Sequence, residues 1–411
     1  MMRRRIISTL MATAALGGLG QLVGLTVGGL LVQDILHGKK WVGTANAASS
    51  IGTAIGALTL AKYMQRSGRR RGLTLGYVIG ALGALLAVVA SRQSNYWILM
   101  VALVLYGVAN TSNQQSRFAA ADVTAAESRA RVVGLVVWAS TIGVVIGPKL
   151  AGPAGKRFES LGHNQWGGAF VVAAIAFVIA AIALAVLLRP DPLDIARSIN
   201  PPRTAAEEAA PVDVRACLRR PSVKLPVITL MVNQVVMVSI MSVTNVHLRD
   251  NGYTTGAIGT VISGHVFGMF APSPISGWLC DRIGRVPMII SSCFVMVTGA
   301  LLAALANPVN HGAMIVALFV LGLGWNGNFV AGSTLVTDAV TQHERPRLQG
   351  VTDMITYFAS AAAAISAGLL VGTTGYPKMA IIGGSIAAVL GVLVMAFRSS
   401  VVIPDREPAL V

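Results

Sequence analysis

Long apolar stretches separated by short polar segments dominate the pattern of this chain. Each stretch is about 20 residues long, the length that an α-helix needs to cross the hydrocarbon core of a bilayer. Twelve can be distinguished, and we predict a membrane-spanning helix over each: 8–34, 43–64, 73–91, 96–118, 131–154, 167–189, 225–248, 256–279, 287–306, 311–338, 348–371 and 377–398. The pattern therefore predicts an all-α membrane protein.

The longest polar segment, 189–224, divides the twelve stretches into six and six. It contains six prolines and charges of both signs, a composition typical of a linker rather than of a buried helix. We therefore predict an N-terminal six-helix bundle over 1–188, a cytoplasmic linker over 189–224 and a C-terminal six-helix bundle over 225–411.

The two halves repeat one another at equal spacing. The matched residues of the first half are Gly52, Gly68, Arg69, Asn110, Asp122, Arg129, Arg131 and Gly134, and those of the second half are Gly268, Gly284, Arg285, Asn326, Asp338, Arg345, Arg347 and Gly350. An internal repeat of six spans indicates two pseudo-symmetric bundles related by an axis along the membrane normal, with a substrate path between them.

Composition and charge agree with this interpretation. Of 411 residues, 54% are hydrophobic and 12% are charged, which is too apolar for a soluble protein of this length. The net charge of +16 raises the question of nucleic-acid binding, but 22 of the 32 Lys and Arg residues fall in segments that one orientation makes cytoplasmic, against 7 in outer loops. This positive-inside bias predicts a multi-pass protein of the plasma (bacterial inner) membrane with both termini in the cytoplasm, and no nucleic-acid partner.

Several other classes of site find no support in the sequence. The three cysteines, Cys217, Cys280 and Cys293, form no CxxC motif, so we expect neither a structural disulfide nor a metal site. There is no GxxxxGK[ST] loop for a nucleotide and no nucleophile–base constellation in the loops. We therefore expect no cofactor and no enzymatic activity, and a monomer in the membrane.

A run of small residues marks the fifth apolar stretch. It comprises Gly134, Gly143, Gly147-Pro148 and Gly152. Glycines at helical spacing let a neighbouring helix approach closely, and a Gly-Pro pair weakens the helix at one point. The pattern predicts a seam that moves, with ordinary close packing of one transmembrane helix as the alternative.

The cytoplasmic loop between spans eight and nine carries a cluster of charges. Its residues are Gly277, Asp281, Arg282, Gly284 and Arg285. The chain must turn sharply at Gly284, and Asp281 can lie at the positive N-terminus of a neighbouring helix. We predict that Arg285 pairs with Asp338 and that such pairs hold the cytoplasmic side closed. The alternative is a solvated loop that only obeys the positive-inside rule.

These motifs resemble those of the major facilitator superfamily, and the resemblance covers essentially the whole chain. The 277–285 segment looks like the second-half copy of that family's loop motif between spans two and three. The run from Gly134 to Gly152 looks like the fifth-span motif of the twelve-span drug:proton antiporters. That motif usually ends in Gly-Gly, whereas here it ends in Ala151-Gly152. The resemblance implies an exporter.

The first-half copy of the loop motif departs from the family pattern. Gln65 occupies the position where the family has an aspartate, and a neutral amide cannot supply an anion to a helix terminus. The lock in this copy is therefore expected to be weaker, or to rest on a pair between Arg69 and Asp122.

Polar residues inside lipid-spanning helices are costly and usually face a cavity or a partner. The candidates for a substrate cavity are Gln21, Asn110, Asn113, Gln114, Asn233, Gln234, His265, Trp325, Asn326 and Tyr357. The resemblance implies that spans one, four, seven and ten line the cavity, and most of these residues lie there. For each amide, packing between helices is the alternative to ligand contact, and for His265 a hydrogen-bonded packing role is the alternative.

Three charged residues are candidates for proton coupling. Arg117 resembles the fourth-span arginine of the antiporters, with a snorkelling arginine as the alternative. Asp353 lies about two turns into span eleven, and Asp34 ends span one near the outer surface. A carboxylate inside a membrane suits reversible protonation near neutral pH. We expect Asp353 to be the coupling residue, followed by Asp34.

Together these features predict a secondary active transporter that exports small lipophilic compounds in exchange for protons by alternating access. Its partners would be a small-molecule substrate, protons and the lipid bilayer. Two alternatives remain open at this point, an uptake symporter for a metabolite and a membrane sensor that transports nothing. The sequence does not identify the substrate.

Overall fold

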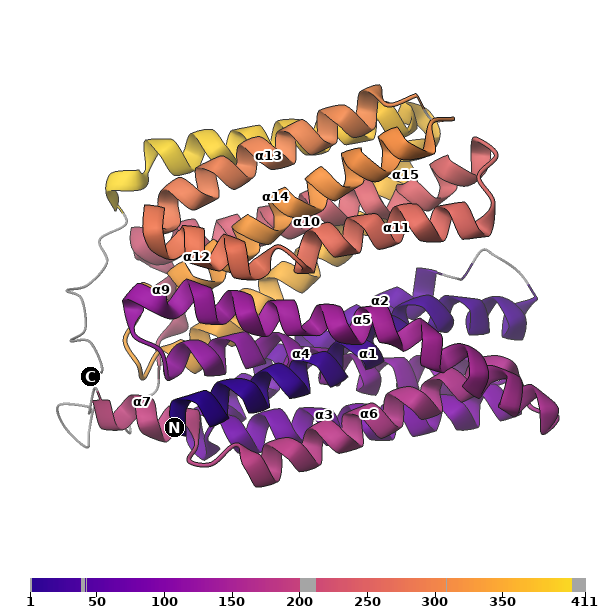
Figure 1. Cartoon of the computed structure of the whole chain (residues 1–411), viewed down its shortest axis with the longest axis horizontal. Coiled ribbons are helices and arrows are strands. Elements are labelled where there is room, and N and C mark those ends of the chain that lie inside the picture. The colour runs from indigo at the N-terminus through magenta and orange to yellow at the C-terminus, as the bar shows by residue number, and fades with distance from the viewer. Residues whose placement is uncertain (1, 38–40, 42, 200–211, 308, 401–411) are drawn as a thin grey trace. The chain divides into compact units, whose positions relative to one another are not determined.

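A computed structural model of the chain describes residues 2–37, 41, 43–199, 212–307 and 309–400 (Figure 1). Within these residues the regular structure is helical. The elements are α1 (Met2–Leu36), α2 (Gly43–Ser67), α3 (Arg69–Gln93), α4 (Tyr96–Asp122), η1 (Ala126–Ser128), α5 (Arg129–Ser160), α6 (Gln165–Leu187), α7 (Pro192–Ile199), α9 (Val214–Arg219), α10 (Pro221–Asp250), α11 (Thr255–Phe270), α12 (Ser273–Ile283), α13 (Arg285–Leu305), α14 (His311–Asp338), α15 (Arg345–Ala396) and η2 (Arg398–Ser400).

All twelve predicted stretches lie on these helices to within a few residues. The eighth is divided between α11 and α12, because Pro272 lacks the N–H that would continue the helix. The eleventh and twelfth share α15, which is interrupted at Gly375, where a φ of 73° favours glycine. Among the described residues, eight helices are by themselves long and apolar enough to cross a membrane.

The chain forms two compact units that do not follow the order of the sequence. The first comprises 1–123, 139–212 and 342–354, and the second comprises 124–138, 213–341 and 355–411. The start of α15 therefore belongs to the first unit and the start of α5 to the second. The boundaries at 188 and 225, drawn from the linker, remain a prediction about the two sequence halves.

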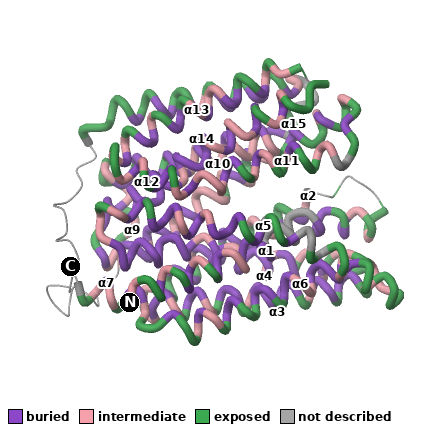
Figure 2. Tube along the Cα trace, viewed as in Figure 1, coloured by how far each residue is buried: buried purple, intermediate pink, exposed green. Residues whose placement is uncertain are grey.

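In the first unit, α4 contacts α1, α2 and α3, and α3 and α6 run side by side (Figure 1). The core contains an aromatic cluster in which the ring centroid of Phe177 lies 5.8 Å from that of Tyr77 and 5.1 Å from that of Tyr106. Buried positions recur along α3 between exposed ones, as Figure 2 shows, which is the pattern of a helix with one lipid-facing side, whereas α4 is mostly buried along its second half.

The second unit repeats these contacts. Its central helix α14 contacts α10, α11, α12 and α13, as α4 contacts the first three helices of its own unit. Buried residues such as Met296, Leu321 and Trp325 form the core. Equivalent helices therefore make equivalent contacts in both copies, as the internal repeat of the sequence predicts. This equivalence allows matched positions of the two copies to be compared directly.

Candidate functional site

The first unit holds a buried arginine at the start of α3. Arg69 follows the turn at Gly68, whose φ of 87° favours glycine, and its side chain is fully buried. Its Nε lies 2.8 Å from Oδ2 of Asp122, and its Nη1 donates to Oε1 of Gln115 at 3.2 Å. Its Nη2 donates to Oε1 of Gln349 on α15. The structure thus brings together the predicted pair, Arg69 and Asp122, and adds two glutamines that were not among the predicted site residues.

A second buried ion pair lies one helical turn further along α15. Nη2 of Arg117 is 2.8 Å from Oδ1 of Asp353, and the two side chains are 3% and 6% exposed. Gln115 donates from Nε2 to Oδ2 of Asp353 at 2.8 Å. Arg117 also donates from Nη1 to Oε1 of Gln114. Because Gln115 contacts both Arg69 and Asp353, a single amide side chain connects the two ion pairs.

The second unit holds the matching cluster around Arg285. Its Nε lies 3.1 Å from Oδ2 of Asp338, as predicted, and its Nη1 lies 3.0 Å from Oδ1 of Asp281. Asp338 also contacts Arg129 at the start of α5. Two buried arginines therefore share one carboxylate, and this cluster, like that around Arg69, lies at the end of its unit predicted to be cytoplasmic.

Asp281 lies at the N-terminus of α5. Its two oxygens accept hydrogen bonds from the backbone N–H groups of Ala130 at 3.1 Å and Arg131 at 2.8 Å. These groups lack partners within the helix, and the helix dipole favours an anion there. Burial raises the pKa of the Asp281 carboxyl above its ordinary value, against the lowering effect of these N–H groups and of Arg285. Arg282, also predicted for gating, lies with its guanidinium carbon 5.3 Å from the centre of the Trp278 ring.

The matching position of the first unit is Gln65, and its surroundings explain the departure from the pattern. The residue of α15 that matches Ala130 is Pro346, which has no N–H to offer. The Gln65 amide instead approaches the carbonyl oxygen of His343, with Nε2 at 3.5 Å. The first copy therefore lacks both the carboxylate and one of the two donors that it would bind.

A carboxylate from elsewhere caps α3. Asp191, in the turn after α6, accepts hydrogen bonds from the backbone N–H groups of Arg69 at 2.9 Å and Arg70 at 2.8 Å. In addition, Arg197 of α7 donates to the carbonyl oxygen of Gln65 at 3.0 Å. Sequence reasoning missed Asp191, because nothing in its local pattern points to a helix that lies over 100 residues away.

Comparisons with known proteins agree with the fold and the repeat. The family model of the Major Facilitator Superfamily matches residues 10–249 and 227–410. The chain belongs to this family. It is 35% identical over 378 residues to the uncharacterized MFS-type transporter YdeG of Bacillus subtilis (strain 168), covering 91% of this chain and 87% of that protein. It is 26% identical over 375 residues to the riboflavin transporter RfnT of Brucella anthropi, covering 91% and 90% of the two chains.

Solved structures show the same fold. The human organic anion transporter MFSD10 superposes with a TM-score of 0.76 at 12% identity, covering 95% of this chain and 99% of that one. The Escherichia coli fucose:proton symporter FucP superposes with a TM-score of 0.72 at 14% identity, covering 95% and 98%. The protein is thus an all-α membrane transporter with the twelve-helix fold of two pseudo-symmetric bundles, and it is not an enzyme.

Within this family fold, the two copies differ deep in the charge clusters. Four polar residues of the first unit, Gln115, Arg117, Gln349 and Asp353, match Ala331, Ser333, Val133 and Val137 of the second. The second copy packs the equivalent helices with small and apolar side chains. The Arg117–Asp353 pair is therefore not a requirement of the fold.

The two carboxylates predicted for proton coupling lie in different environments. Asp353 is buried against Arg117, whereas Asp34 is exposed at the end of α1. Oδ2 of Asp34 accepts hydrogen bonds from Nε1 of Trp166 at 2.7 Å and from Nδ2 of Asn164 at 3.4 Å, both near the start of α6. Of these two carboxylates, Asp353 is the one that is buried away from water. Its protonation would therefore change the charge of a buried group.

Two of the predicted cavity asparagines contact neighbouring helices. Nδ2 of Asn326 donates to the carbonyl oxygen of Met269 at 2.6 Å and to Oγ of Ser273, which lie on either side of the break at Pro272. Its match in the first unit, Asn110, approaches Oγ1 of Thr53 at 3.4 Å. These contacts favour the alternative of packing between helices for this pair.

The other cavity candidates are dispersed over both units. Asn113 packs beside Gly17 of α1, and Tyr357 is partly buried on α15. His265 is buried and bonds through Nδ1 to the carbonyl oxygen of Leu318 at 2.8 Å. The side chain of Gln21 lies outside the described residues. Within the second unit, Asn233 and Gln234 each form a hydrogen bond with Trp325.

The glycines of the fifth-span motif face different neighbours. A Cβ on Gly134 would overlap the carbonyl oxygen of Ser273 and lie 3.4 Å from the Cα of Gly277, so α5 packs tightly on α12 there. Gly143 packs on Ala15 of α1, whereas Gly152 has open space around it. The helix continues through Gly147-Pro148, and the side chain of Pro148 lies outside the described residues. The weak point expected at Gly147-Pro148 and the moving seam therefore remain predictions.

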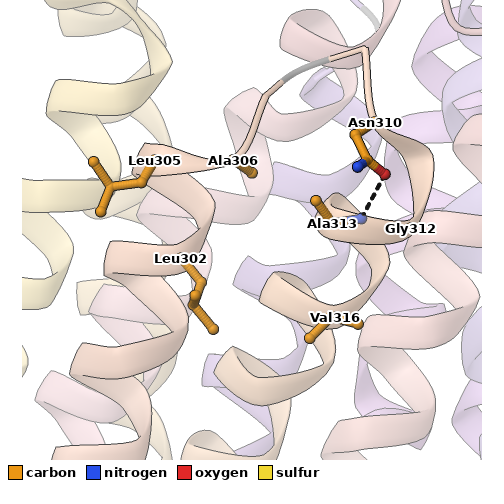
Figure 3. A pocket seen from close by; sticks show the side chains of 7 residues that line it. All are labelled: Leu302, Leu305, Ala306, Asn310, Gly312, Ala313 and Val316. Atoms are coloured by element: carbon orange, nitrogen blue, oxygen red, sulfur yellow. Dashed lines mark hydrogen bonds between the residues drawn. The ribbon is translucent and has the colours of Figure 1, made fainter.

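A pocket in the second unit is separate from these clusters. It lies between α13 and α14, has a volume of about 510 Å³ and is lined by Leu302, Leu305, Ala306, Asn310, Gly312, Ala313 and Val316 (Figure 3). At the edge of the pocket, the Asn310 side chain accepts a hydrogen bond from the backbone N–H of Ala313 and so caps α14. The lining is otherwise apolar, and several of its residues are strongly exposed, as expected of a surface that faces lipid.

Proposed function

We propose that this transporter exports small lipophilic organic compounds in exchange for protons, by alternating access, in the plasma (bacterial inner) membrane. The observation that carries the proposal is the buried Arg117–Asp353 pair, which one copy of the repeat has and the other lacks. A buried ion pair contributes little net stability, because desolvation offsets the attraction of its charges. Its presence in one copy alone therefore favours a role in function.

Protonation of Asp353 would remove the negative charge that Arg117 and Gln115 contact. Gln115 would then donate to a neutral carboxyl group, which is a weaker acceptor than the carboxylate, while the same side chain also accepts from Arg69. The protonation state of Asp353 is in this way connected to the Arg69–Asp122 pair and to the start of α15. Loosening this segment on protonation would couple proton binding to the opening of the cytoplasmic side.

The direction of transport rests on the fifth-span motif, whose close packing at Gly134 and Gly143 fits the pattern that resembles the antiporters. A second candidate function is proton-coupled uptake of a metabolite. It is favoured by the similarity to the riboflavin transporter RfnT over 91% of this chain.

The decisive experiment uses the purified protein in liposomes that contain a pH-sensitive dye. Under an imposed proton gradient, addition of lipophilic compounds should release protons from the wild-type vesicles. In Asp353→Asn this substrate-evoked proton movement should disappear, because the amide cannot exchange a proton. Asp34→Asn, the same change at an exposed carboxylate, should keep it.

Unchanged proton movement in Asp353→Asn would remove that residue from the coupling mechanism. If no lipophilic compound moved protons while riboflavin entered the vesicles together with protons, the uptake function would replace export.

A further inference from the structure

The second unit contains a cluster of aromatic rings on α14 and α11. Trp325 and Phe329, one turn apart on α14, are stacked with centroids 4.6 Å apart and planes inclined by 14°. Phe270, at the end of α11, meets Trp325 edge to face at 5.9 Å. Phe270 and Phe329 are both partly exposed. The cluster therefore has aromatic surface that other groups can reach.

Two amides of α10 border these rings. Nε1 of Trp325 donates to Oε1 of Gln234 at 3.1 Å, and Nδ2 of Asn233 donates to the carbonyl oxygen of Trp325 at 3.2 Å. Asn233 is only 1% exposed, and its Oδ1 has no hydrogen-bond partner among the described residues. A buried acceptor without a partner is destabilising, because nothing replaces the hydrogen bond to water that it lost on burial. This oxygen is thus a buried acceptor that lacks a donor and lies beside an aromatic surface.

The internal repeat indicates that the fold does not need this cluster. The positions of the first copy that match Asn233, Gln234, Phe270, Trp325 and Phe329 are Gly17, Gly18, Ala54, Ala109 and Asn113. The first copy thus forms equivalent helix contacts without any aromatic residue at these five positions. Rings and amides placed together in one copy, with an unused acceptor among them, point to a ligand rather than to packing.

We propose that Trp325, Phe329 and Asn233 bind a flat aromatic compound that carries an N–H or O–H donor. The ring of the ligand packs against the aromatic pair, and its donor binds Oδ1 of Asn233. Stacking on aromatic side chains accepts rings of varied outline, whereas the buried acceptor selects those that have a donor. This inference rests on the proposed transport function and specifies the class of its substrate.

The test compares carbazole with N-methylcarbazole, two neutral flat compounds that differ at the N–H donor. Binding to the purified full-length protein is measured by equilibrium dialysis. Carbazole should bind roughly tenfold more tightly than its methylated form, as expected for one buried hydrogen bond. In Asn233→Leu and in Asn233→Ala the preference should disappear, because neither side chain has an acceptor, while N-methylcarbazole still binds.

An aromatic control lies on the same helix. Phe329→Leu should weaken the binding of both compounds, whereas Phe319→Leu should not, because Phe319 packs against Phe267, which is 54% exposed on the outer face of α11. Three results would each overturn the proposal. They are equal binding of the two compounds to the wild type, no binding of carbazole, and equal losses of binding in Phe329→Leu and Phe319→Leu.

The binding experiment is independent of proton coupling. Equilibrium dialysis needs no proton gradient, so the preference for carbazole is measured whether or not protons move. Selective binding without any proton movement in the wild type would refute the proposed coupling and leave the ligand site standing. Proton movement with other compounds, without selective binding of carbazole, would support the proposed coupling and refute the ligand site.

Discussion

At the scale of single residues, the protein places charges where an apolar residue would be less costly. Arg117 and Asp353 are both nearly buried and contact each other at 2.8 Å. Removing one partner of such a pair leaves an uncompensated charge, which typically destabilises a protein by about 3–5 kcal/mol. Removing both replaces the pair by neutral groups, and this change is often close to neutral in stability.

We therefore predict that Asp353→Asn is destabilised and that the double variant Arg117→Gln with Asp353→Asn recovers most of the loss. The recovery follows because no buried charge is left without a partner in the double variant. The measurement is the thermal unfolding midpoint of the purified proteins in one detergent. If the pair were exposed to solvent, the single variant would lose almost no stability and the double variant would have almost none to recover.

Transport should separate from stability in these variants. The double variant should be stable but should move no protons, because it lacks the carboxylate. Additive losses of stability in the double variant would show that the two charges do not compensate each other.

At the scale of elements, the N-termini of α5 and α15 differ although their sequences match. The start of α5 offers the N–H groups of Ala130 and Arg131 to Asp281. The start of α15 has Pro346 and Arg347 at these positions and faces Gln65. The first-copy contact is thus weakened on both sides, which favours its release before that of the second copy.

We predict that restoring both sides strengthens this contact. In Gln65→Asp alone, the new carboxylate has one matched donor, the backbone N–H of Arg347. In Gln65→Asp with Pro346→Ala it has two, because the alanine supplies the N–H that Pro346 lacks. A carboxylate at a helix N-terminus stabilises by about 0.5–2 kcal/mol. The double variant should therefore unfold at a higher temperature than either single variant and should transport more slowly.

Pro346→Ala alone serves as the control for the change in backbone. If the double variant were no more stable than the sum of the two single changes, the absence of the N–H at Pro346 would not explain Gln65.

At the scale of the whole molecule, charge determines how the chain lies across the membrane. The bias of Lys and Arg toward one set of loops predicts that both termini and the 189–224 segment face the cytoplasm. The charge clusters around Arg69 and Arg285 then lie at the cytoplasmic ends of their units. A reversed orientation would place them on the outer side and would exclude the proposed role in gating.

Two exposed serines allow this orientation to be measured. Ser160, at the end of α5, is predicted to lie outside, and Ser198, in α7, is predicted to lie in the cytoplasm. In intact cells, a membrane-impermeant maleimide should label Ser160→Cys but should label Ser198→Cys only after permeabilisation. The three native cysteines are buried and can be replaced by alanine to remove background. Labelling in the opposite order would reverse the topology.

The sequence by itself determined the class of the protein and much of its organisation. Apolar stretches of helical length, an equal-spacing repeat and a one-sided charge distribution are local or additive properties, and they do not depend on which helices meet. The same holds for Arg69 with Asp122 and for Arg285 with Asp338, because the repeat and the loop motif already place each arginine at a turn and each aspartate at a helix end.

Only the tertiary structure decided which distant segments share a site. It placed Gln115 between Arg69 and Asp353, capped α3 with Asp191 and, within the part of the chain that the structure describes, left Oδ1 of Asn233 without a partner beside Trp325. None of these contacts follows from spacing along one helix, since each joins helices that are far apart in the chain. Whether a buried polar side chain is satisfied depends on the three-dimensional position of its neighbours, and that information appears only when the helices are packed.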